Sequence, residues 1–380
     1  MYVSDLSLKS FRNYQQLDVV FVPGVTVFLG ANGQGKTNLV EAVEYLSTLC
    51  SHRSATVAPL VRSGDLQAVL RARVVAGVDD PRTLQLELEI NPTTANRARL
   101  NRMPASLRQL PTALRTVLFT PDDLDIVKGG PAARRDFIDF LVSARWPRFI
   151  GVRSDLAKVL KQRNALLKQV AHCGGRLSEE EIITLEVWDE RLIGFSADLI
   201  AARVNTIRDL MPYLTALYAG ISPVSETVVA HYLSAATTEP DVITTTYEIW
   251  VDNLTTALRI RRNEELRAGV TLVGPHRDDI EFKIGLFPAR GYISHGEAWS
   301  LALALKLAAY QLLRADSINP VLILDDVFAE LDKTRRTRLA THIADAEQVL
   351  ITAAVDDDVP EVLHGVRFRV EAGNVSAIGD

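Results

Sequence analysis

The sequence predicts an α/β fold that a mainly helical segment interrupts, and three observations indicate this. A strongly apolar run at 25–29 leads into a glycine-rich loop and then into a segment with apolar residues at helical spacing. From about 121 to 269 the pattern is helical, with few strand signals. Afterwards, short apolar runs typical of strands return at 270–273, 321–324 and 348–352.

The glycine-rich loop has the spacing of a phosphate-binding loop. Its glycines let backbone amides close around phosphate oxygens, Lys36 can reach the outer phosphates, and the Thr37 hydroxyl suits magnesium. The following helix directs its positive end toward the anion. We therefore expect ATP to bind here with Mg²⁺. The loop consists of Gly30, Ala31, Asn32, Gly33, Gln34, Gly35, Lys36 and Thr37, followed by Asn38.

An antiparallel β meander is expected in the first hundred residues. Apolar and polar residues alternate at 68–74 and at 84–90, so each run buries one face. Asp79, Asp80 and Pro81 between the runs predict a connecting turn. This pattern differs from that of a purely parallel sheet.

The helical segment separates two parts of the core. We expect 121–269 to form a second lobe, and 1–120 together with 270–380 to form the core. Turn signals at 173–175 and 221–223 separate its helices. The expected helices are 154–171, 179–211 and 244–267.

The composition excludes several classes of protein. Of the 380 residues, 47% are hydrophobic, which allows a substantial core. The net charge of -5 gives no general attraction to nucleic acid, so DNA contacts would depend on local basic patches. The two cysteines, the start of the chain and the lack of an apolar stretch of about 18 residues favour a soluble, cytoplasmic protein that does not associate with membranes.

Asp325 and Asp326 follow the apolar run at 321–324. Acidic side chains at the end of a buried strand opposite a phosphate-binding loop hold magnesium in nucleotide-hydrolysing proteins. An acidic pair can also be a solvated strand end or a helix cap. Because the loop is present, we expect Asp325 to bind Mg²⁺ with Thr37, and Asp326 to orient or deprotonate the attacking water. Lys36 and Asp326 are thus the expected catalytic residues.

A small polar residue and a glycine stand before the helical segment that contains Trp299. They are Ser294 and Gly296, with His295 between them and Glu297 after them. Such a helix start can be an ordinary cap, or it can bind a phosphate.

Further motifs are spread over nearly the whole chain. They are Phe11-Arg12-Asn13-Tyr14, Asn32 to Leu39, Gly129-Gly130-Pro131 with Arg134-Arg135, Gly274-Pro275-His276-Arg277-Asp278-Asp279, and Leu324 to Asp332. Together they resemble the RecF family of bacterial recombinational-repair ATPases, which are related to the heads of Rad50 and SMC proteins.

The resemblance implies an ABC-type P-loop ATPase head, like those of SMC and Rad50, with a helical second lobe. It further implies ATP-dependent homodimerisation, binding to duplex DNA or to a junction of duplex and single strand, and weak DNA-stimulated ATP hydrolysis. Family members act with RecO and RecR to load RecA at gaps, and they support replication restart and the SOS response. These are expectations for this chain.

The resemblance also implies roles for individual residues. Ser294, Gly296 and Glu297 match the signature motif that contacts the ATP of the opposing protomer, although His295 and Glu297 depart from the usual glycine and glutamine. Asp332 matches the D-loop aspartate, or it is a helix cap. Arg12 and Asn13 could line the nucleotide, or they could form a surface turn. His276 and Arg277 are more typical of a salt-bridged loop than of catalysis.

DNA contact is expected from arginines that grip phosphates without reading sequence. Runs of arginine are also common on solvated faces. The candidates are Arg97, Arg99, Arg102, Arg108, Arg134, Arg135, Arg145, Arg148, Arg153, Arg259, Arg261 and Arg262, and His52 with Arg53 after the phosphate-loop helix.

Two other classes of function remain possible from the sequence. The ATP-binding subunit of a membrane transporter also uses a phosphate-binding loop and a signature motif. However, Thr352 and Ala353 stand where transporters place a switch histidine, and the helical insertion is large. A non-hydrolysing repair scaffold would use the nucleotide for structure alone.

Overall fold

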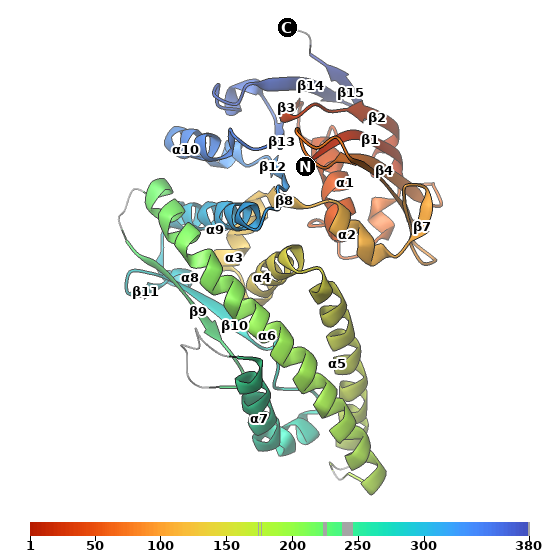
Figure 1. The fold of residues 1–380 in the computed structure, drawn as a ribbon, viewed down its shortest axis with the longest axis vertical. Coiled ribbons are helices and arrows are strands. Elements are labelled where there is room, and N and C mark those ends of the chain that lie inside the picture. Colours follow the sequence, from red (N-terminus) through yellow and green to blue (C-terminus); the bar gives the residue numbers. More distant parts are fainter. Residues whose placement is uncertain (174, 176, 223–225, 238–245, 379–380) are drawn as a thin grey trace. The chain divides into compact units, whose positions relative to one another are not determined.

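The computed structural model describes residues 1–173, 175, 177–222, 226–237 and 246–378 (Figure 1). The chain forms two compact units. The head unit comprises Met1–Asp123, Gly220–Pro223 and Trp299–Asp380, and the helical unit comprises Leu124–Ala219 and Val224–Ala298.

A six-stranded, mostly parallel sheet forms one layer of the head unit, in the order β15-β14-β3-β13-β12-β8. β15 alone runs antiparallel to its neighbour. The apolar runs at 321–324 and 348–352 are neighbouring buried parallel strands here, as predicted. The strands are β3 (Gly24–Leu29), β8 (Thr116–Phe119), β12 (Val321–Asp325), β13 (Gln348–Ala353), β14 (Gly365–Glu371) and β15 (Asn374–Ala377).

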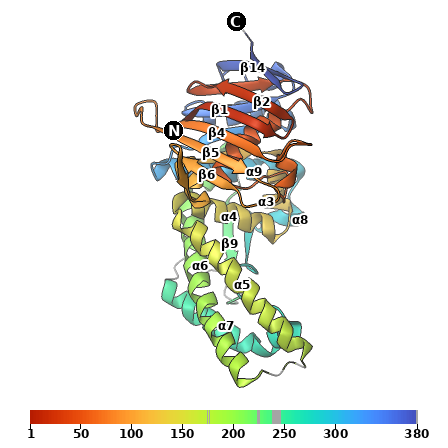
Figure 2. The same cartoon turned by 90° about the vertical axis from the view of Figure 1, so that its right-hand side faces the viewer.

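An antiparallel meander forms the second layer, in the order β2-β1-β4-β5-β6-β7 (Figure 2). The predicted pairing of the two alternating runs is confirmed, with Ala72 opposite Leu86. Their apolar faces are buried, whereas on the charged faces the arginines of the first run are exposed and the glutamates of the second are half-buried. The strands are β1 (Tyr2–Phe11), β2 (Tyr14–Val20), β4 (Ala68–Val75), β5 (Thr83–Ile90), β6 (Arg97–Leu100) and β7 (Met103–Ala105).

The helix α1 (Lys36–Thr48) lies between the two sheets and contacts β8, β12 and β13 of one and β1 and β4 of the other. A helix covered on both sides must be apolar around most of its surface. Leu39, Val43 and Leu46 accordingly belong to the same buried cluster as residues of both sheets. The remaining helices of the head unit are α2 (Leu110–Ala113), the greater part of α9 (His295–Ala315) and α10 (Lys333–Ile343), with 3-10 turns at Ala58–Leu60, Leu107–Gln109, Pro121–Asp123, Phe328–Glu330 and Asp356–Asp358.

The helical unit combines helices with a three-stranded antiparallel sheet in the order β11-β10-β9. Because β10 pairs with β9, the segment 270–298 belongs to this unit, whereas the sequence placed it in the core. The elements are α3 (Leu124–Lys128), α4 (Pro131–Arg145), α5 (Arg148–His172), α6 (Glu179–Ile221), β9 (Val228–Leu233), α7 (Tyr247–Ala268), β10 (Asp279–Ile284), β11 (Phe287–Pro288) and α8 (Ala289–Tyr292).

Two details of the helical prediction are wrong. The helix expected to end at 211 continues through Pro212 to Ile221, because the buried side chains of Leu214 and Tyr218 hold the last turns. The run at 270–273 is not a strand, because Thr271 bonds to the side chain of Asn164 instead of a neighbouring strand. Residues 244 and 245 of the third expected helix, 174 of the first turn and 223 of the second lie outside the described residues.

A buried arginine joins the three long helices of this unit. Arg163 of α5 is fully buried and donates to Asp189 of α6 at 2.8 Å and to Glu265 of α7 at 2.6 Å. Its third donor reaches Thr271 at 2.8 Å. Since every carboxylate oxygen and guanidinium nitrogen in such a cluster needs a partner, the network fixes the relative register of the helices.

The segment from Gly274 to Asp279 is held by contacts within the same unit. Asp278 accepts from the Tyr232 hydroxyl at 2.7 Å, and Asp279 accepts a bidentate pair from Arg134. His276 Nε2 and the Arg277 guanidinium both bond to the carbonyl of Thr271. The structure therefore gives His276 and Arg277 structural contacts.

Acid should destabilise the helical unit through His276. Burial lowers the pKa of this side chain to about 4, and the nearby charges of Arg277, Arg135 and Arg163 act in the same direction. The unfolded chain then binds the proton more tightly, so stability is complete above the unfolded pKa of about 6.5 and is lost as the pH falls toward 4. We expect His276→Gln to reduce this loss by up to about 3 kcal/mol in urea titrations at several pH values.

The exposed His172 offers a matched control in the same unit. An equal change of the pH dependence of stability in His172→Gln, or no change in His276→Gln, would contradict the role of His276 in the acid sensitivity of this unit.

Candidate nucleotide-binding site

The loop between β3 and α1 is shaped by contacts that only glycine permits at two positions. Gly35 has φ +116°, and a Cβ there would lie 2.6 Å from Asn13 Nδ2 and 3.0 Å from the Tyr14 hydroxyl. A Cβ on Gly30 would lie 2.3 Å from the carbonyl oxygen of Val370 in β14. The loop therefore sits against the start of β2 on one side and against β14 on the other.

Hydrogen bonds secure the same two sides. Tyr14 donates to the carbonyl of Gly35 at 3.0 Å, and Asn13 Nδ2 donates to that of Gln34 at 3.2 Å. On the other side, Gln34 Oε1 accepts from the amide of Ala372 in the β14–β15 turn at 2.7 Å. These bonds hold the loop in a shape that suits phosphate.

Lys36 points into the loop that precedes it. Its ammonium donates to the carbonyls of Gly30 and Ala31 at 2.7 and 3.3 Å and to Asn32 Oδ1 at 3.4 Å, and the residue is only 3% exposed. A buried cation beside a glycine-rich loop is a strong attractor for phosphate oxygens.

One carboxylate oxygen of Asp325 accepts hydrogen bonds from two threonine hydroxyls, one of them on the loop helix. Thr37 Oγ1 at the start of α1 donates to Asp325 Oδ1 at 3.0 Å, and Thr352 Oγ1 donates to the same oxygen at 2.7 Å. The parallel register of β12 and β13 places Asp325 beside Thr352. Burial raises the pKa of the Asp325 carboxyl, while the hydrogen bonds from Thr352 and Thr37 lower it.

The oxygen atoms of Thr37 and Asp325 suit Mg²⁺, which takes one or two protein oxygens and completes its shell with water and substrate phosphates. Within the described ranges, no group of three or more His, Cys, Asp or Glu could hold a metal. The donor set therefore fits a magnesium ion that arrives with a nucleotide, and does not fit a metal held by the protein alone.

Asp326 stands just past the strand with an unusual backbone. Its φ is +52°, in the left-handed region that aspartate tolerates better than most residues. Its amide donates to Thr352 Oγ1 at 2.9 Å. One threonine hydroxyl thus orients both members of the acidic pair.

The family assignment follows from comparison with known proteins. The family described as RecF/RecN/SMC N terminal domain matches residues 2–374. The chain is 52% identical over 387 residues to the DNA replication and repair protein RecF of Cutibacterium acnes, covering 99% of this chain and 98% of that protein. It belongs to the RecF family. It is 50% identical over 382 residues to the protein of the same name from Streptomyces avermitilis, with both chains fully covered.

Solved structures agree with this assignment. The recombination mediator protein RecF-ATPrS in the RecFOR pathway superposes with a TM-score of 0.89 at 28% identity, covering 100% of this chain and 98% of that one. An Smc head bound to the C-winged helix domain of ScpA gives a TM-score of 0.57 at 16% identity, covering 100% of this chain and 97% of that one. The predicted ABC-type fold, like that of SMC heads, is confirmed.

The segment that resembles a signature motif forms a capping box at the start of α9. Ser294 Oγ accepts from the amide of Glu297 at 3.2 Å, and Glu297 Oε2 accepts from the amide of Ser294 at 2.7 Å. The side-chain hydrogen bond with Ser294 lowers the pKa of Glu297. Ser294 is exposed and Gly296 is half-buried, so the start of the helix is accessible to solvent.

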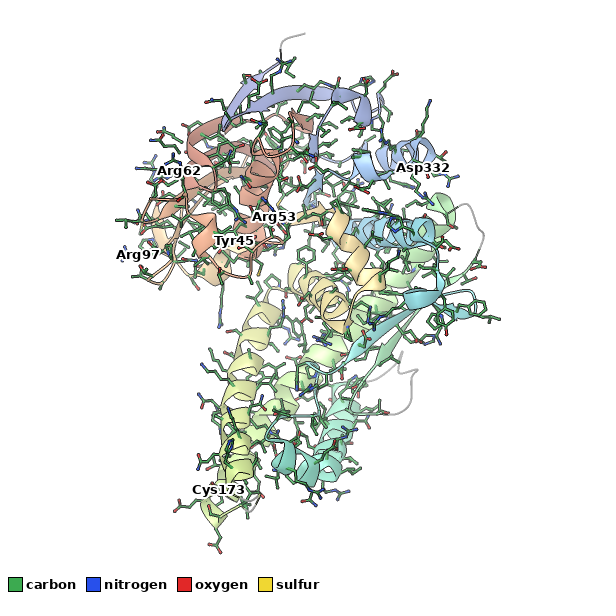
Figure 3. All side chains as sticks on the ribbon, turned by 180° about the vertical axis from the view of Figure 1, so that it is seen from behind. Tyr45, Arg53, Arg62, Arg97, Cys173 and Asp332 are labelled. Carbon is green, nitrogen blue, oxygen red and sulfur yellow. The ribbon has the colours of Figure 1, made fainter. Side chains whose placement is uncertain are left out.

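Asp332 is the N-cap of α10, as Figure 3 shows where it labels this residue. Its carboxylate accepts from the amide of Arg335 at 2.9 Å and pairs with the guanidinium of the same residue. Half of the side chain, 52%, remains exposed. The cap is a structural role, and the D-loop role remains a prediction.

Arg12 contacts the helix that follows the loop, and its nucleotide-lining role stays a prediction. Its guanidinium forms a bidentate pair with the fully buried carboxylate of Glu41 on α1 and also donates to the carbonyl of Pro59. Asn13 touches the loop itself, and it accepts from Asn38 Nδ2 at 2.7 Å. Arg12 thus anchors the helix behind the loop, and Asn13 and Asn38 brace the loop.

The sequence analysis did not place Glu44 at this site, and it gave His52 only as a candidate DNA contact. Glu44 lies on the buried face of α1, and its carboxylate contacts His52 Nδ1 at 2.6 Å. The opposite ring atom, His52 Nε2, lies 4.0 Å from Asp325 Oδ2. Burial lowers the pKa of His52, but Glu44 and the other nearby carboxylates raise it more, so the pKa lies above its usual value. The signal was a glutamate between the apolar residues Val43 and Leu46 of this helix.

Most candidate DNA-binding arginines already have partners within their own unit. Arg134 and Arg145 are buried in ion pairs with Asp279 and Asp209, so they are unsuited to contact DNA. The more exposed ones also lie beside carboxylates: Arg97 by Glu89, Arg99 by Glu87, Arg148 by Asp198, Arg153 by Asp139 and Arg261 by Glu264. Figure 3 labels Arg53 and Arg97, of which Arg53 donates to Asn38 Oδ1 at 2.6 Å.

Removing the Thr352 hydroxyl should destabilise the site. Thr352→Val keeps the shape of the side chain, but it takes a donor from Asp325 and leaves the amide of Asp326 without its acceptor. We expect a loss of about 1–3 kcal/mol in the free energy of unfolding, measured by urea denaturation. Thr352→Ser keeps the hydroxyl and should lose much less. Equal stability of Thr352→Val and the unchanged protein would contradict the role of this hydrogen-bond pair.

Proposed function

We propose that this chain is an ATPase of recombinational DNA repair, in which ATP closes a homodimer on DNA and hydrolysis releases it. The observation that carries the proposal is the convergence of Lys36, Thr37 and Asp325 at the end of a parallel sheet, with Thr37 bonded to Asp325. The names of its relatives, which are DNA replication and repair proteins, support a role in DNA repair.

Nucleotide binding rests on the loop and the start of α1. Backbone amides of 30–35 and the Lys36 ammonium would bind the phosphates, and Asn13 and Asn38 would keep the loop closed around them. Bound Mg²⁺ would neutralise charge on the phosphates, held by Thr37 and Asp325. The ATP analogue named with a solved RecF structure supports ATP as the nucleotide.

Hydrolysis would depend on Asp326. Its carboxylate lies one residue past the metal-binding Asp325, and Thr352 fixes its backbone. From that position it would orient the attacking water and accept a proton from it. We propose slow turnover that DNA stimulates.

Dimerisation would supply the other half of each site. Ser294, Gly296 and Glu297 begin a helix whose positive end is accessible to solvent, which suits a γ-phosphate held by a second copy. Asp332, half exposed at its own helix start, would cross the same interface. ATP would then favour the closed dimer because both subunits contact its γ-phosphate.

DNA binding is proposed through exposed arginines, without reading of sequence. Arg102 and Arg259 are exposed, and exposed ion-paired arginines can exchange a carboxylate for a phosphate at little cost. The preferred substrate would be duplex DNA or a junction with a single strand. Together with RecR and RecO, the chain would load RecA at gaps, supporting replication restart and the SOS response.

The transporter alternative has no support in the structure or in the family. The chain belongs to the RecF family, and within the described residues no helix combines the length and apolarity that crossing a membrane requires. The scaffold alternative differs from the proposal in one measurable quantity, which is phosphate release.

Two variants should separate binding from hydrolysis. Lys36→Ala removes the ammonium from the loop and should abolish ATP binding and dimerisation. Asp326→Asn should bind ATP but remain a closed dimer, because its amide cannot accept the proton. Sedimentation with ATP, ADP or no nucleotide, each with and without DNA, measures dimerisation, and phosphate release measures turnover. Normal hydrolysis in both variants would refute the assignment, and a complete lack of hydrolysis in the unchanged protein would favour the scaffold.

The shared sites should be detectable by mixing two inactive proteins. Lys36→Ala damages the phosphate loop and Ser294→Arg damages the signature segment, so each protein alone should hydrolyse little ATP. A mixed dimer carries both defects in one site and leaves the other site intact, so mixing the two proteins should restore part of the ATP hydrolysis. No recovery on mixing, despite dimerisation, would show that Ser294 does not act across the interface.

A further inference from the structure

Three large apolar side chains are exposed together in the helical unit. The rings of Phe287 in β11 and Tyr292 in α8 stack with their centroids 5.9 Å apart and 20° between their planes. They are 60% and 69% exposed, and Leu286 in the turn before β11 is 91% exposed. We call Leu286, Phe287 and Tyr292 the aromatic patch. Exposed apolar side chains that gather in this way mark an interaction surface more often than single ones do.

The local backbone fixes the patch in this place. β11 pairs with β10, with Phe287 opposite Ile284. Ile284 and Ala289 on either side of β11 are buried, so they hold the segment against the rest of the unit. Gly291, with φ +87°, interrupts the short helix before Tyr292. The exposed side chains of the patch are therefore carried by a backbone that packed neighbours hold in position.

The aromatic patch adjoins the signature segment. Only Ile293 separates Tyr292 from Ser294, and two residues of chain span at most about 7 Å. Arg290, which is exposed, stands between the two aromatic residues in the sequence. Among the residues that the structure describes, Arg290 takes part in no ion pair. A partner that contacts Ser294 therefore also reaches an apolar surface and a free cation.

A loop of the head unit has the complementary composition. It runs from Val355 to Asp358 and follows β13, which contributes Thr352 to the nucleotide site. Val355 is 54% exposed. Asp357 is also exposed, and within the described part of the chain it belongs to no ion pair. The other two aspartates pair inside the unit, Asp356 with Arg367 at 2.8 Å and Asp358 with Arg336 at 3.2 Å. The loop thus offers one apolar side chain and one free carboxylate beside the nucleotide site.

We propose that in the ATP-bound homodimer the aromatic patch and Arg290 of one copy pack against the Val355–Asp358 loop of the other copy. The inference rests on the function proposed above, in which the signature segment of each copy meets the nucleotide of the other. The patch adjoins that segment, and the loop adjoins the nucleotide site. A contact that brings Ser294 to the phosphate of the other copy therefore brings patch and loop to the same interface, twice in a dimer with twofold symmetry.

The two surfaces match in apolarity and in charge. Val355 and the exposed rings lose contact with water when they pack together, which stabilises the closed dimer. Arg290 and Asp357 carry opposite charges, so they favour this pairing over a contact between two patches, which would bring two arginines together. Aromatic and arginine side chains are also frequent anchors of protein interfaces. The closed dimer is thus held by this contact in addition to the γ-phosphate.

Sedimentation of the full chain with Mg²⁺ and a non-hydrolysable ATP analogue tests the aromatic patch. We expect Phe287→Ser and Tyr292→Ser each to raise the dissociation constant of the dimer about tenfold, because each dimer loses two apolar anchors. Both side chains are exposed in the monomer, so the fold and the binding of the analogue by dilute monomer should not change. Ile260→Ser, at an exposed apolar residue of the same unit, is the matched control and should dimerise normally.

Exchanging the charges identifies the surface that the patch meets. Arg290→Asp and Asp357→Arg each place like charges at both contacts of the dimer, and each should weaken dimerisation by about threefold to tenfold. When the two variants are mixed, the mixed dimer has one reversed pair and one original pair. Dimerisation should therefore return to nearly the level of the unchanged protein. A role of either residue in the fold of the monomer would not give this recovery.

The outcomes separate this inference from the proposed function. If the unchanged protein stays monomeric with the analogue, the proposed ATP-dependent dimer fails, and the inference fails with it. If it dimerises and the Phe287 and Tyr292 variants dimerise equally well, only the inference fails, and the patch is open to a different protein. The inference is also overturned if the charge variants leave dimerisation unchanged, or if they weaken it without recovery on mixing.

Discussion

The nucleotide site depends on one oxygen atom. Asp325 Oδ1 accepts hydroxyl hydrogen bonds from Thr37, at the start of α1, and from Thr352, at the end of β13. These groups come from three elements that are distant in the sequence. Since the bond from Thr352 is short and buried and the bond from Thr37 is partly buried, the carboxylate acts as a common reference for the loop helix and two strands. The phosphate-binding loop and the acidic pair keep their geometry because they share this point.

The packing of α1 holds the phosphate-binding loop before it in place. The helix is covered by a sheet on both sides, so it can shift only by disturbing a close-packed core. Its few polar residues are therefore informative. Glu41 and Glu44 are buried on this helix, and each holds a basic partner, Arg12 or His52. Burial of a charge without such a partner would cost several kcal/mol.

Sequence reasoning succeeded where local patterns determine structure. The alternation at 84–90 predicted a half-buried strand, and the apolar run at 321–324 predicted a buried parallel one. It was wrong where tertiary contacts outweigh local signals. The helix expected to end at 211 continues through Pro212, because buried neighbours carry it onward. Thr271 was expected in a strand, but its amide donates a hydrogen bond to the side chain of Asn164. The partners of Arg134 and His52 could not be predicted, because a contact between segments that are distant in the chain produces no periodic pattern in the sequence.

The order of strands also has a consequence for how the protein is made. β3, which leads into the phosphate-binding loop, lies between β13 and β14, and both of these come from the last part of the chain. On the ribosome, β3 has no partner strand in its sheet until residues 348–353 have been synthesised. Its edges thus stay unpaired during most of translation, and unpaired strand edges with apolar side chains favour aggregation.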